Sequence, residues 1–273
     1  LAKANGKTIP ERLIKEYANA FKGLSEFEIQ NIMQLILSQN EDITKSQINL
    51  VFEQKQQMIK KAGILEMISP KESLDDIGGL ENLKDWLRQK EKVLSDMEGA
   101  KAFGVDMPKG VLIAGIPGCG KSITAKAAAK LFNIPLLRLD MGRLLGKYVG
   151  ESEANMRKAI ELAEAISPCV LWVDELEKAF AGIGGEGSGA EVTTRLFGSF
   201  LTWLQEKETP VFVVATANDV TSLPPELLRK GRFDEIFYVG LPDRDEQRKI
   251  FEIHIKKRRP EDLPSIQVQR SGY

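Results

Sequence analysis

One eight-residue segment, GIPGCGKS at residues 115–122, constrains the fold more than any other part of this chain. It matches the pattern G-x-x-x-x-G-K-[ST] at every fixed position, and it lies between an apolar run and a helix-favouring run. In such a strand–loop–helix unit the glycines let backbone N–H groups converge on a phosphate, and the helix contributes its positive N-terminus. The sequence therefore predicts a phosphate-binding loop, in which Lys121 contacts the β- and γ-phosphates and Ser122 holds Mg²⁺.

Short apolar runs alternate with helical segments on both sides of this loop. Strands separated by helices form right-handed crossovers, which give a parallel sheet with helices on both faces and ligands bound beyond the carboxyl ends of the strands. The sequence therefore predicts an α/β fold with a parallel five-stranded sheet. Its expected strands are residues 111–115, 136–139, 170–174, 211–216 and 235–239.

The chain divides into three parts by pattern. Residues 1–70 are predicted to form a small helical N-terminal domain, with a capping box at Ser25 and Glu28 and a helix over residues 45–62 that ends at Gly63. Its apolar stripes are interpreted as core, and a partner-binding face is the alternative. The α/β core follows over residues 71–241, and residues 242–273 are expected to begin a helical lid that is incomplete.

Two carboxylates follow the buried run CVLWVDE at residues 169–175. At the carboxyl end of a strand beside the phosphate loop, Asp174 can support Mg²⁺ through water, and Glu175 can polarise a water that attacks the γ-phosphate. The alternative is a helix N-terminus enriched in acids, since Glu175 and Glu177 also lie where acids favour a helix dipole.

Polar residues also follow the next two predicted elements. Asn218 ends the apolar run VFVVATAND, and an amide there can hydrogen-bond both the γ-phosphate and the attacking water. Arg229 and Arg232 precede the last strand about one helical turn apart, which suits arginine fingers at developing phosphate charge. Surface salt bridging is the alternative reading of these arginines.

Together these stretches, over residues 75 to roughly 259, resemble the AAA ATPases, the ring-forming branch of the P-loop family. The resemblance makes residues 115–122 the Walker A loop, residues 169–175 the Walker B strand, and Asn218 the first sensor. It also implies that Arg229 and Arg232 enter the neighbouring subunit's site. The nucleotide-contacting residues that it implies are Ile77, Gly78, Gly115, Pro117, Gly118, Cys119, Gly120, Lys121, Ser122, Ile123 and His254.

The segment MGRLLGKYVGESE, residues 141–153, resembles the central pore loop of this family. In that loop an aromatic, an apolar residue and a glycine grip an extended polypeptide, and here they would be Tyr148, Val149 and Gly150. Local packing of Tyr148 in a turn is the alternative. The glycine-rich residues 184–189 are expected to form a second loop near the pore.

A narrower resemblance covers nearly the whole chain, on QKQQMIKKAGILEMI, SLDDIGGLENLKDWLRQ and AEAISPCVLWVDELEKAF. It is to the chloroplast hypothetical reading frame forty-six family of single-module AAA proteins and their bacterial relatives. Departures from the broad AAA pattern are Ile116 and Cys119 in the loop and Glu177 where Asp is commoner.

Composition excludes several other classes. Two cysteines favour a reducing cytoplasm, or the chloroplast stroma for a plastid-encoded chain, and no apolar run approaches the roughly 20 residues that span a bilayer. The net charge of −1 disfavours a nucleic-acid motor. The sequence therefore predicts an ATP- and Mg²⁺-dependent ATPase that forms a homo-oligomeric, hexameric ring and remodels or threads a protein substrate. An ATP-gated adaptor, whose helical domain binds a partner, is the alternative.

Overall fold

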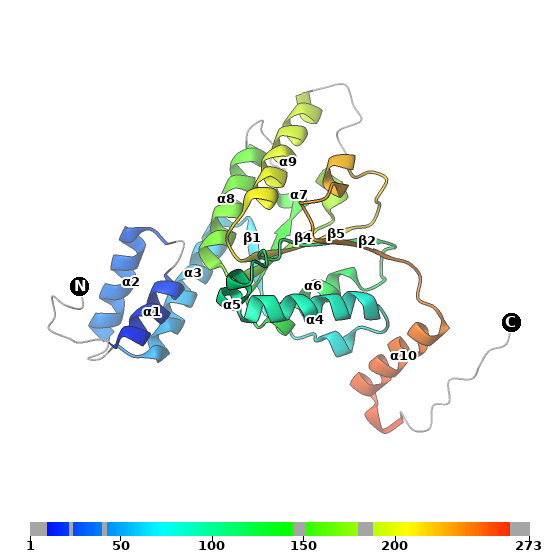
Figure 1. Ribbon diagram of the computed structural model, residues 1–273, viewed down its shortest axis with the longest axis horizontal. Coiled ribbons are helices and arrows are strands. Elements are labelled where there is room, and N and C mark those ends of the chain that lie inside the picture. Colours follow the sequence, from blue (N-terminus) through cyan, green and yellow to red (C-terminus); the bar gives the residue numbers. More distant parts are fainter. Residues whose placement is uncertain (1–9, 22–23, 40–42, 145–150, 180–187, 263–273) are drawn as a thin grey trace.

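A six-stranded sheet runs through the centre of the molecule, with helices on both of its faces (Figure 1). The computed structural model describes residues 10–21, 24–39, 43–144, 151–179 and 188–262. The strand order is β1-β3-β4-β5-β2-β6. In chain order the strands are β1 (Leu65–Ile68), β2 (Gly110–Gly115), β3 (Leu136–Asp140), β4 (Cys169–Asp174), β5 (Val211–Ala217) and β6 (Glu235–Val239).

Strands β2 to β6 pair in parallel, which confirms the predicted α/β sheet. The predicted strand number requires a correction, because β1 adds a sixth strand that runs antiparallel to β3, with Leu65 opposite Leu139 and Ile68 opposite Leu136. Four residues directly after a helix carry too short a pattern to distinguish a strand from a helix end. They form a strand because the edge of β3 provides backbone hydrogen-bond partners for them.

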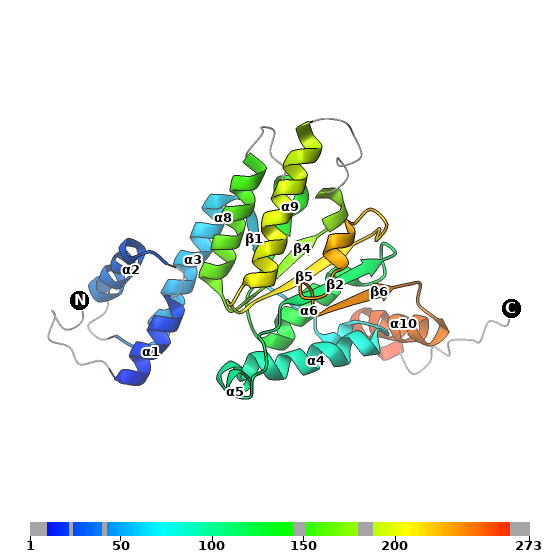
Figure 2. The ribbon, with the colours of Figure 1, turned by 45° about the horizontal axis from the view of Figure 1, so that its top comes forward.

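Alternate residues of the strands contribute to two separate cores. Leu171, Val173 and Val213 pack under α8 (Glu151–Ile166) and α9 (Ser188–Glu206) on one face. Trp172 and Val214 pack against α4 (Glu81–Ser95) and α6 (Lys121–Phe132) on the other. Figure 2 shows α8 and α9 together on one side of the sheet. The helices are α1 (Glu11–Ala20), α2 (Glu26–Gln39), α3 (Ile48–Ala62), α4 (Glu81–Ser95), α5 (Met97–Ala102), α6 (Lys121–Phe132), α7 (Met141–Leu144), α8 (Glu151–Ile166), α9 (Ser188–Glu206) and α10 (Arg244–Arg258).

Helices α1, α2 and α3 form a separate helical region at the opposite end of the molecule from α10 (Figure 1). The predicted capping box is present, since Ser25 N donates to Glu28 Oε2 at 2.8 Å and Glu28 N donates to Ser25 Oγ at 3.3 Å. The predicted end of α3 is also confirmed, because Gly63 adopts a φ of 68° and its N–H bonds to the carbonyl of Ile59. Local sequence signals therefore define these helix ends.

Helix α3 joins the helical region to the α/β core. It lies alongside α8 (Figure 2) and continues through Gly63 into β1. Lys55 of α3 is 2% exposed, and its Nζ donates to the carbonyl of Ala165 at 2.6 Å. Burial lowers the pKa of Lys55 to about 8. A buried amine at the C-terminal end of α8 thus ties the two parts together.

No helix in the described part of the chain combines the length and the apolar character needed to cross a bilayer.

Candidate functional site

The phosphate-loop pattern begins where β2 meets β6. Gly115, the last residue of β2, has a φ of 143°, and a Cβ there would collide with the backbone of Val239. The next residue continues the contact, since Ile116 N donates to Val239 O at 3.1 Å. Glycine at this position lets the chain leave the sheet and turn into the loop, and α6 then begins at Lys121.

Lys121 folds back over the loop that precedes it. This residue is 6% exposed, and its Nζ donates to the carbonyls of Gly115 at 2.8 Å and Ile116 at 2.7 Å. Burial lowers the pKa of this amine, while the nearby Cys119, Glu177 and Asp174 oppose the shift. An ammonium group is thereby held at the N-terminus of α6, where an anion is favoured.

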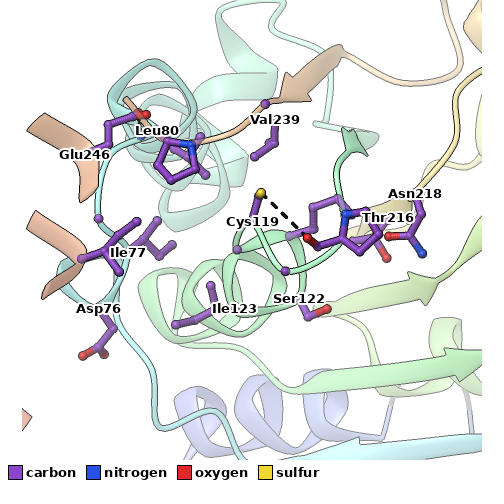
Figure 3. A pocket seen from close by; sticks show the side chains of 18 of the residues that line it. Asp76, Ile77, Leu80, Cys119, Ser122, Ile123, Thr216, Asn218, Val239 and Glu246 are labelled. Atoms are coloured by element: carbon purple, nitrogen blue, oxygen red, sulfur yellow. Dashed lines mark hydrogen bonds between the residues drawn. The ribbon is translucent and has the colours of Figure 1, made fainter. Parts of the chain in front are cut away.

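A cavity of about 540 Å³ opens around this loop. In Figure 3, Thr216 and Asn218 lie at one end of it, and Ile77 and Glu246 lie at the other. One wall is therefore polar and the other is largely apolar, as a phosphate chain and a flat base would require. The apolar wall contains Ile77, Leu80, Ile123, Val239 and Ile250.

Most of the residues proposed from the sequence line this one cavity, whereas Gly115 is buried as the last residue of β2. Segments far apart in the chain, at the ends of β2, β4 and β5 and in α10, supply them. The cavity-lining members of the predicted set are Ile77, Gly78, Pro117, Gly118, Cys119, Gly120, Lys121, Ser122, Ile123, Asp174, Glu175, Asn218 and His254. Their individual roles stay predictions.

The two predicted arginine fingers are not part of their own chain's cavity. Arg229 is exposed, and Arg232 is half-buried and donates from Nη1 to the carbonyl of Glu226. The predicted pore-loop residues Tyr148, Val149 and Gly150 lie outside the described residues, as does most of the glycine-rich segment 184–189.

Asp174 has a defined partner on each carboxylate oxygen. Thr216 Oγ1 donates to Oδ1 at 2.9 Å, and Arg138 Nη2 donates to Oδ2 at 2.8 Å. A carboxylate oxygen has two lone pairs, so each oxygen keeps one acceptor site in addition to these bonds. The side chain of Asp174 is thus fixed in orientation and can still accept a further hydrogen bond.

The Thr216 hydroxyl is the central hydrogen-bonding group of this edge. It accepts from Glu175 N at 3.3 Å and from Trp172 Nε1 at 3.4 Å. Because both of these groups can only donate, the single hydroxyl proton of Thr216 is directed to Asp174. Thr216, a residue that is 2% exposed, therefore orients both the carboxylate of Asp174 and the backbone that follows it.

The two acids after Asp174 have partners of their own. Glu175 has a φ of 52°, and its Oε2 lies 2.5 Å from Lys178 Nζ, which raises the pKa of Lys178. Glu177 Oε1 accepts from Asn218 Nδ2 at 2.9 Å. The predicted water-activating acid and the predicted sensor are thus each bonded to a residue of the short helix after β4, η4 (Leu176–Ala179).

Helix α10 closes the apolar end of the cavity. A Cβ on Gly78 would overlap Ile250, so only glycine permits this approach. Leu80 N donates to Glu246 Oε1 at 3.2 Å, and Lys257 Nζ lies 2.7 Å from Asp76, whose pKa it lowers. These contacts hold the segment before α4 against α10, beside His254.

Sequence reasoning missed several residues of the site. Thr216 and Arg138 each place a polar group in an otherwise apolar strand. A polar residue at such a position is a sequence signal that could have identified them as members of the site. The contributions of Leu80, Glu246 and Ile250 have no local signal, because they depend on where α10 packs. The fold alone reveals that these residues belong to one site.

The oxygen donors of the cavity fit a hard divalent cation. Ser122 and Asp174 line it together, and hydroxyl and carboxylate oxygens suit Mg²⁺. Within the described residues no cluster of three or more His, Cys, Asp or Glu side chains forms a metal cage. The chain thus offers the few ligands that Mg²⁺ uses when phosphates and water complete its coordination.

A parallel sheet that leads through a glycine loop into a helix, with acids on the neighbouring strand end, defines a P-loop nucleotide-binding protein. Residues 111–241 match the family described as ATPase family associated with various cellular activities (AAA). Residues 1–62 match a second family, the SpoVK-like AAA ATPase, second domain. The chain therefore carries an AAA ATPase domain.

Several curated relatives support this assignment. The "Uncharacterized AAA domain-containing protein ycf46" of Guillardia theta is 49% identical over 97% of this chain and 52% of its own length. The Pyropia yezoensis protein of the same name is 45% identical over 95% of this chain and 52% of its own length. "Cell division control protein 48 homolog C" of Arabidopsis thaliana is 37% identical over 74% of this chain and 24% of its own length. The chain thus spans about half the length of its ycf46 relatives.

Proposed function

We propose that this chain hydrolyses ATP with Mg²⁺ as part of a homo-oligomeric ring that remodels protein substrates. The observation that carries the proposal is the convergence of Lys121, Ser122, Asp174, Glu175 and Asn218 on one cavity with an apolar wall. This arrangement combines a phosphate cradle, acids at the γ-phosphate end and a slot for a base.

In the proposed mechanism, backbone N–H groups of the loop and the Lys121 ammonium bind the phosphates. Ser122 and Asp174 would hold Mg²⁺, which neutralises phosphate charge when bound. Glu175 accepts a proton from the attacking water, since the ion pair of its Oε2 with Lys178 leaves further acceptor sites on the carboxylate. Asn218 orients that water, because its amide keeps a second N–H donor and an acceptor oxygen in addition to the bond with Glu177.

The ring part of the proposal follows from where the arginines lie. Arg229 and Arg232 are outside their own chain's cavity, on the segment before the edge strand β6, so a neighbouring copy can receive them. A head-to-tail contact of this kind closes into a ring when its rotation closes, and the family resemblance suggests a hexamer.

The remodelling part depends on the resemblance of residues 141–153 to a pore loop and on the family of the relatives. We propose a division of labour in which residues 71–241 form the motor and residues 242–273 begin its lid. Residues 1–70 supply a helical domain and, at their end, the strand β1 that joins the sheet of the motor. The substrate in this proposal is an extended polypeptide gripped by Tyr148, Val149 and Gly150.

An ATP-gated adaptor is the second candidate function, and one observation favours it. The acid that would activate water is ion-paired to Lys178 at 2.5 Å, an arrangement that suits nucleotide binding with slow turnover. In this case the helical region would bind a partner, and the bound nucleotide would set the conformation of the chain.

Particle mass and ATPase rate, measured across protein concentration with ATP and Mg²⁺, test the proposal. We expect the rate per subunit to rise as a ring forms, and to fall by about a thousandfold in Arg232→Ala while nucleotide still binds. Glu175→Gln is the matched variant that should bind ATP, assemble and not hydrolyse it. A monomer whose turnover is independent of concentration would contradict the ring and leave the adaptor as the better account.

A further inference from the structure

Arg138 lies beside the acid that is proposed to support the metal, although it does not line the cavity. Its Nη2 is 2.8 Å from Asp174 Oδ2, and the side chains of the two residues are 32% and 13% exposed. This pair is therefore only partly accessible to water, so its charges are screened less than those of a surface pair.

The position of Arg138 is set by the sheet. It is directly opposite Trp172 in the β3–β4 pair, and Asp174 follows two residues later on the same face. The guanidinium lies over the Trp172 ring, with Cζ 5.0 Å from the ring centroid, and Trp172 is 3% exposed. Stacking on a fixed ring holds the planar guanidinium next to the carboxylate.

A second acid approaches the same guanidinium from the opposite side. Glu66 of β1 is directly opposite Arg138 in the β1–β3 pair, and its Oε2 lies 3.9 Å from Arg138 Nη1. Its side chain is 53% exposed, so it is the weaker partner. Arg138 therefore lies between an acid of the proposed metal site and an acid of the strand that follows the helical region.

We propose that Arg138 is a positioning residue that lowers the affinity of the Asp174 site for Mg²⁺, and that Glu66 partly offsets this effect. A fixed positive charge beside a carboxylate cancels part of its attraction for a cation. The inference rests on the proposed metal-dependent nucleotide binding and adds its regulation.

This arrangement connects the helical region to the metal site. Helix α3 ends at Ala62 and β1 begins at Leu65, so a movement of the helical region acts on β1 almost directly. A shift of β1 against β3 changes the Glu66–Arg138 distance, whereas Trp172 keeps Arg138 close to Asp174. A partner bound to the helical region would thereby change how tightly the ATPase site holds its cation.

The direction of the effect separates this proposal from a purely structural role. Loss of structural support at Asp174 weakens cation binding, because the carboxylate loses its orientation. Loss of the Arg138 charge strengthens cation binding, because the repulsion is removed. Measuring the affinity for the cation therefore distinguishes the two roles, which a measurement of turnover cannot do.

The experiment titrates Mn²⁺ into the full chain saturated with ADP, and follows free Mn²⁺ by electron paramagnetic resonance. We expect Arg138→Met, whose thioether keeps the contact with Trp172, to bind Mn²⁺ about three- to tenfold tighter than the wild type. Arg138→Lys keeps the charge and should stay within about twofold of the wild type, and Glu66→Gln should bind Mn²⁺ about twofold more weakly. Added salt should reduce all three differences.

Arg88→Met is the matched control, because Arg88 forms a comparable ion pair with Asp85 at 2.6 Å on the surface of α4. It should leave Mn²⁺ affinity unchanged. ADP binding without metal verifies that each variant is folded. If Arg138→Met folds and binds Mn²⁺ as the wild type does, or more weakly, the inference is overturned.

If Arg138→Met does not fold, Glu66→Gln decides, and unchanged or tighter Mn²⁺ binding in that variant overturns the inference. A wild type that binds ADP without any linked Mn²⁺ site would overturn both this inference and the metal-dependent function on which it rests.

Discussion

The helical region of α1 to α3 and the carboxyl edge of the sheet use their buried residues in different ways. In the helical region one set of buried apolar side chains packs together, and it contains Tyr17, Ala20, Phe21, Ile32, Ile36 and Val51. Ile59, near the end of α3, packs in the core of the sheet instead. At the sheet edge Asp174, Thr216 and Asn218 are buried or half-buried, and each has a polar partner. We therefore expect substitutions in the helical region to change stability, and substitutions at the sheet edge to change nucleotide chemistry.

The largest expected effect is on the stability of the helical region. Ile36 is fully buried, so Ile36→Ala should lower the free energy of unfolding of α1 to α3 by about 3 kcal/mol through lost burial and the cavity left behind. Native-state hydrogen exchange of the α2 and α3 amides measures this, with nucleotide affinity unchanged. Ile14→Ala, at a residue that is 52% exposed, is the control and should cost less than about 0.5 kcal/mol. Loss of ADP binding in Ile36→Ala, with the amides of α1 to α3 still protected from exchange, would contradict this separation of stability from nucleotide chemistry.

The next effect is on catalysis at the sheet edge. Thr216→Val keeps the shape of the side chain but removes the donor to Asp174 and the acceptor for Glu175 N. We expect kcat for ATP to fall about tenfold or more, with a smaller change in KM, because the acids lose their orientation while the phosphate loop is intact. Steady-state kinetics measure this, and Thr216→Ser, which restores the hydroxyl, should recover most of the rate. Equal kcat in Thr216→Val and the wild type would show that the hydroxyl is only structural.

A smaller effect is expected on the pH dependence of stability, at the junction between the helical region and the sheet. Lys55 is buried there, but it holds the two parts together and has no role in the nucleotide site. Burial lowers the pKa of Lys55 to about 8 from 10.5, so above pH 8 the folded chain has released this proton while the unfolded chain retains it. Stability therefore rises with pH in this window, by about 1 kcal/mol between pH 7 and pH 9 from this residue. Chemical denaturation of wild type and Lys55→Met measures it, and the increase should be missing from the variant.

Lys60→Met removes an exposed lysine of the same helix and is the control variant for the pH dependence of stability. Parallel pH curves for wild type and Lys55→Met would contradict the role given to burial at the junction.

Sequence patterns were enough to predict the strand–loop–helix unit at residues 115–122, the five parallel strands and the end of α3 at Gly63. Each of these depends on residues close together in the chain, through glycine conformations, apolar periodicity and helix capping. The sequence also named most of the cavity's lining, because the carboxyl ends of parallel strands meet at one edge of a sheet.

The three-dimensional arrangement was needed to show that residues 65–68 join the sheet, that Thr216 and Arg138 hold Asp174, and that α10 covers Gly78. These contacts depend on strand register and helix packing between segments many residues apart. A polar residue in a strand is visible in the sequence, but its partner is not, because a shift of register by one residue would turn its side chain to the other face of the sheet.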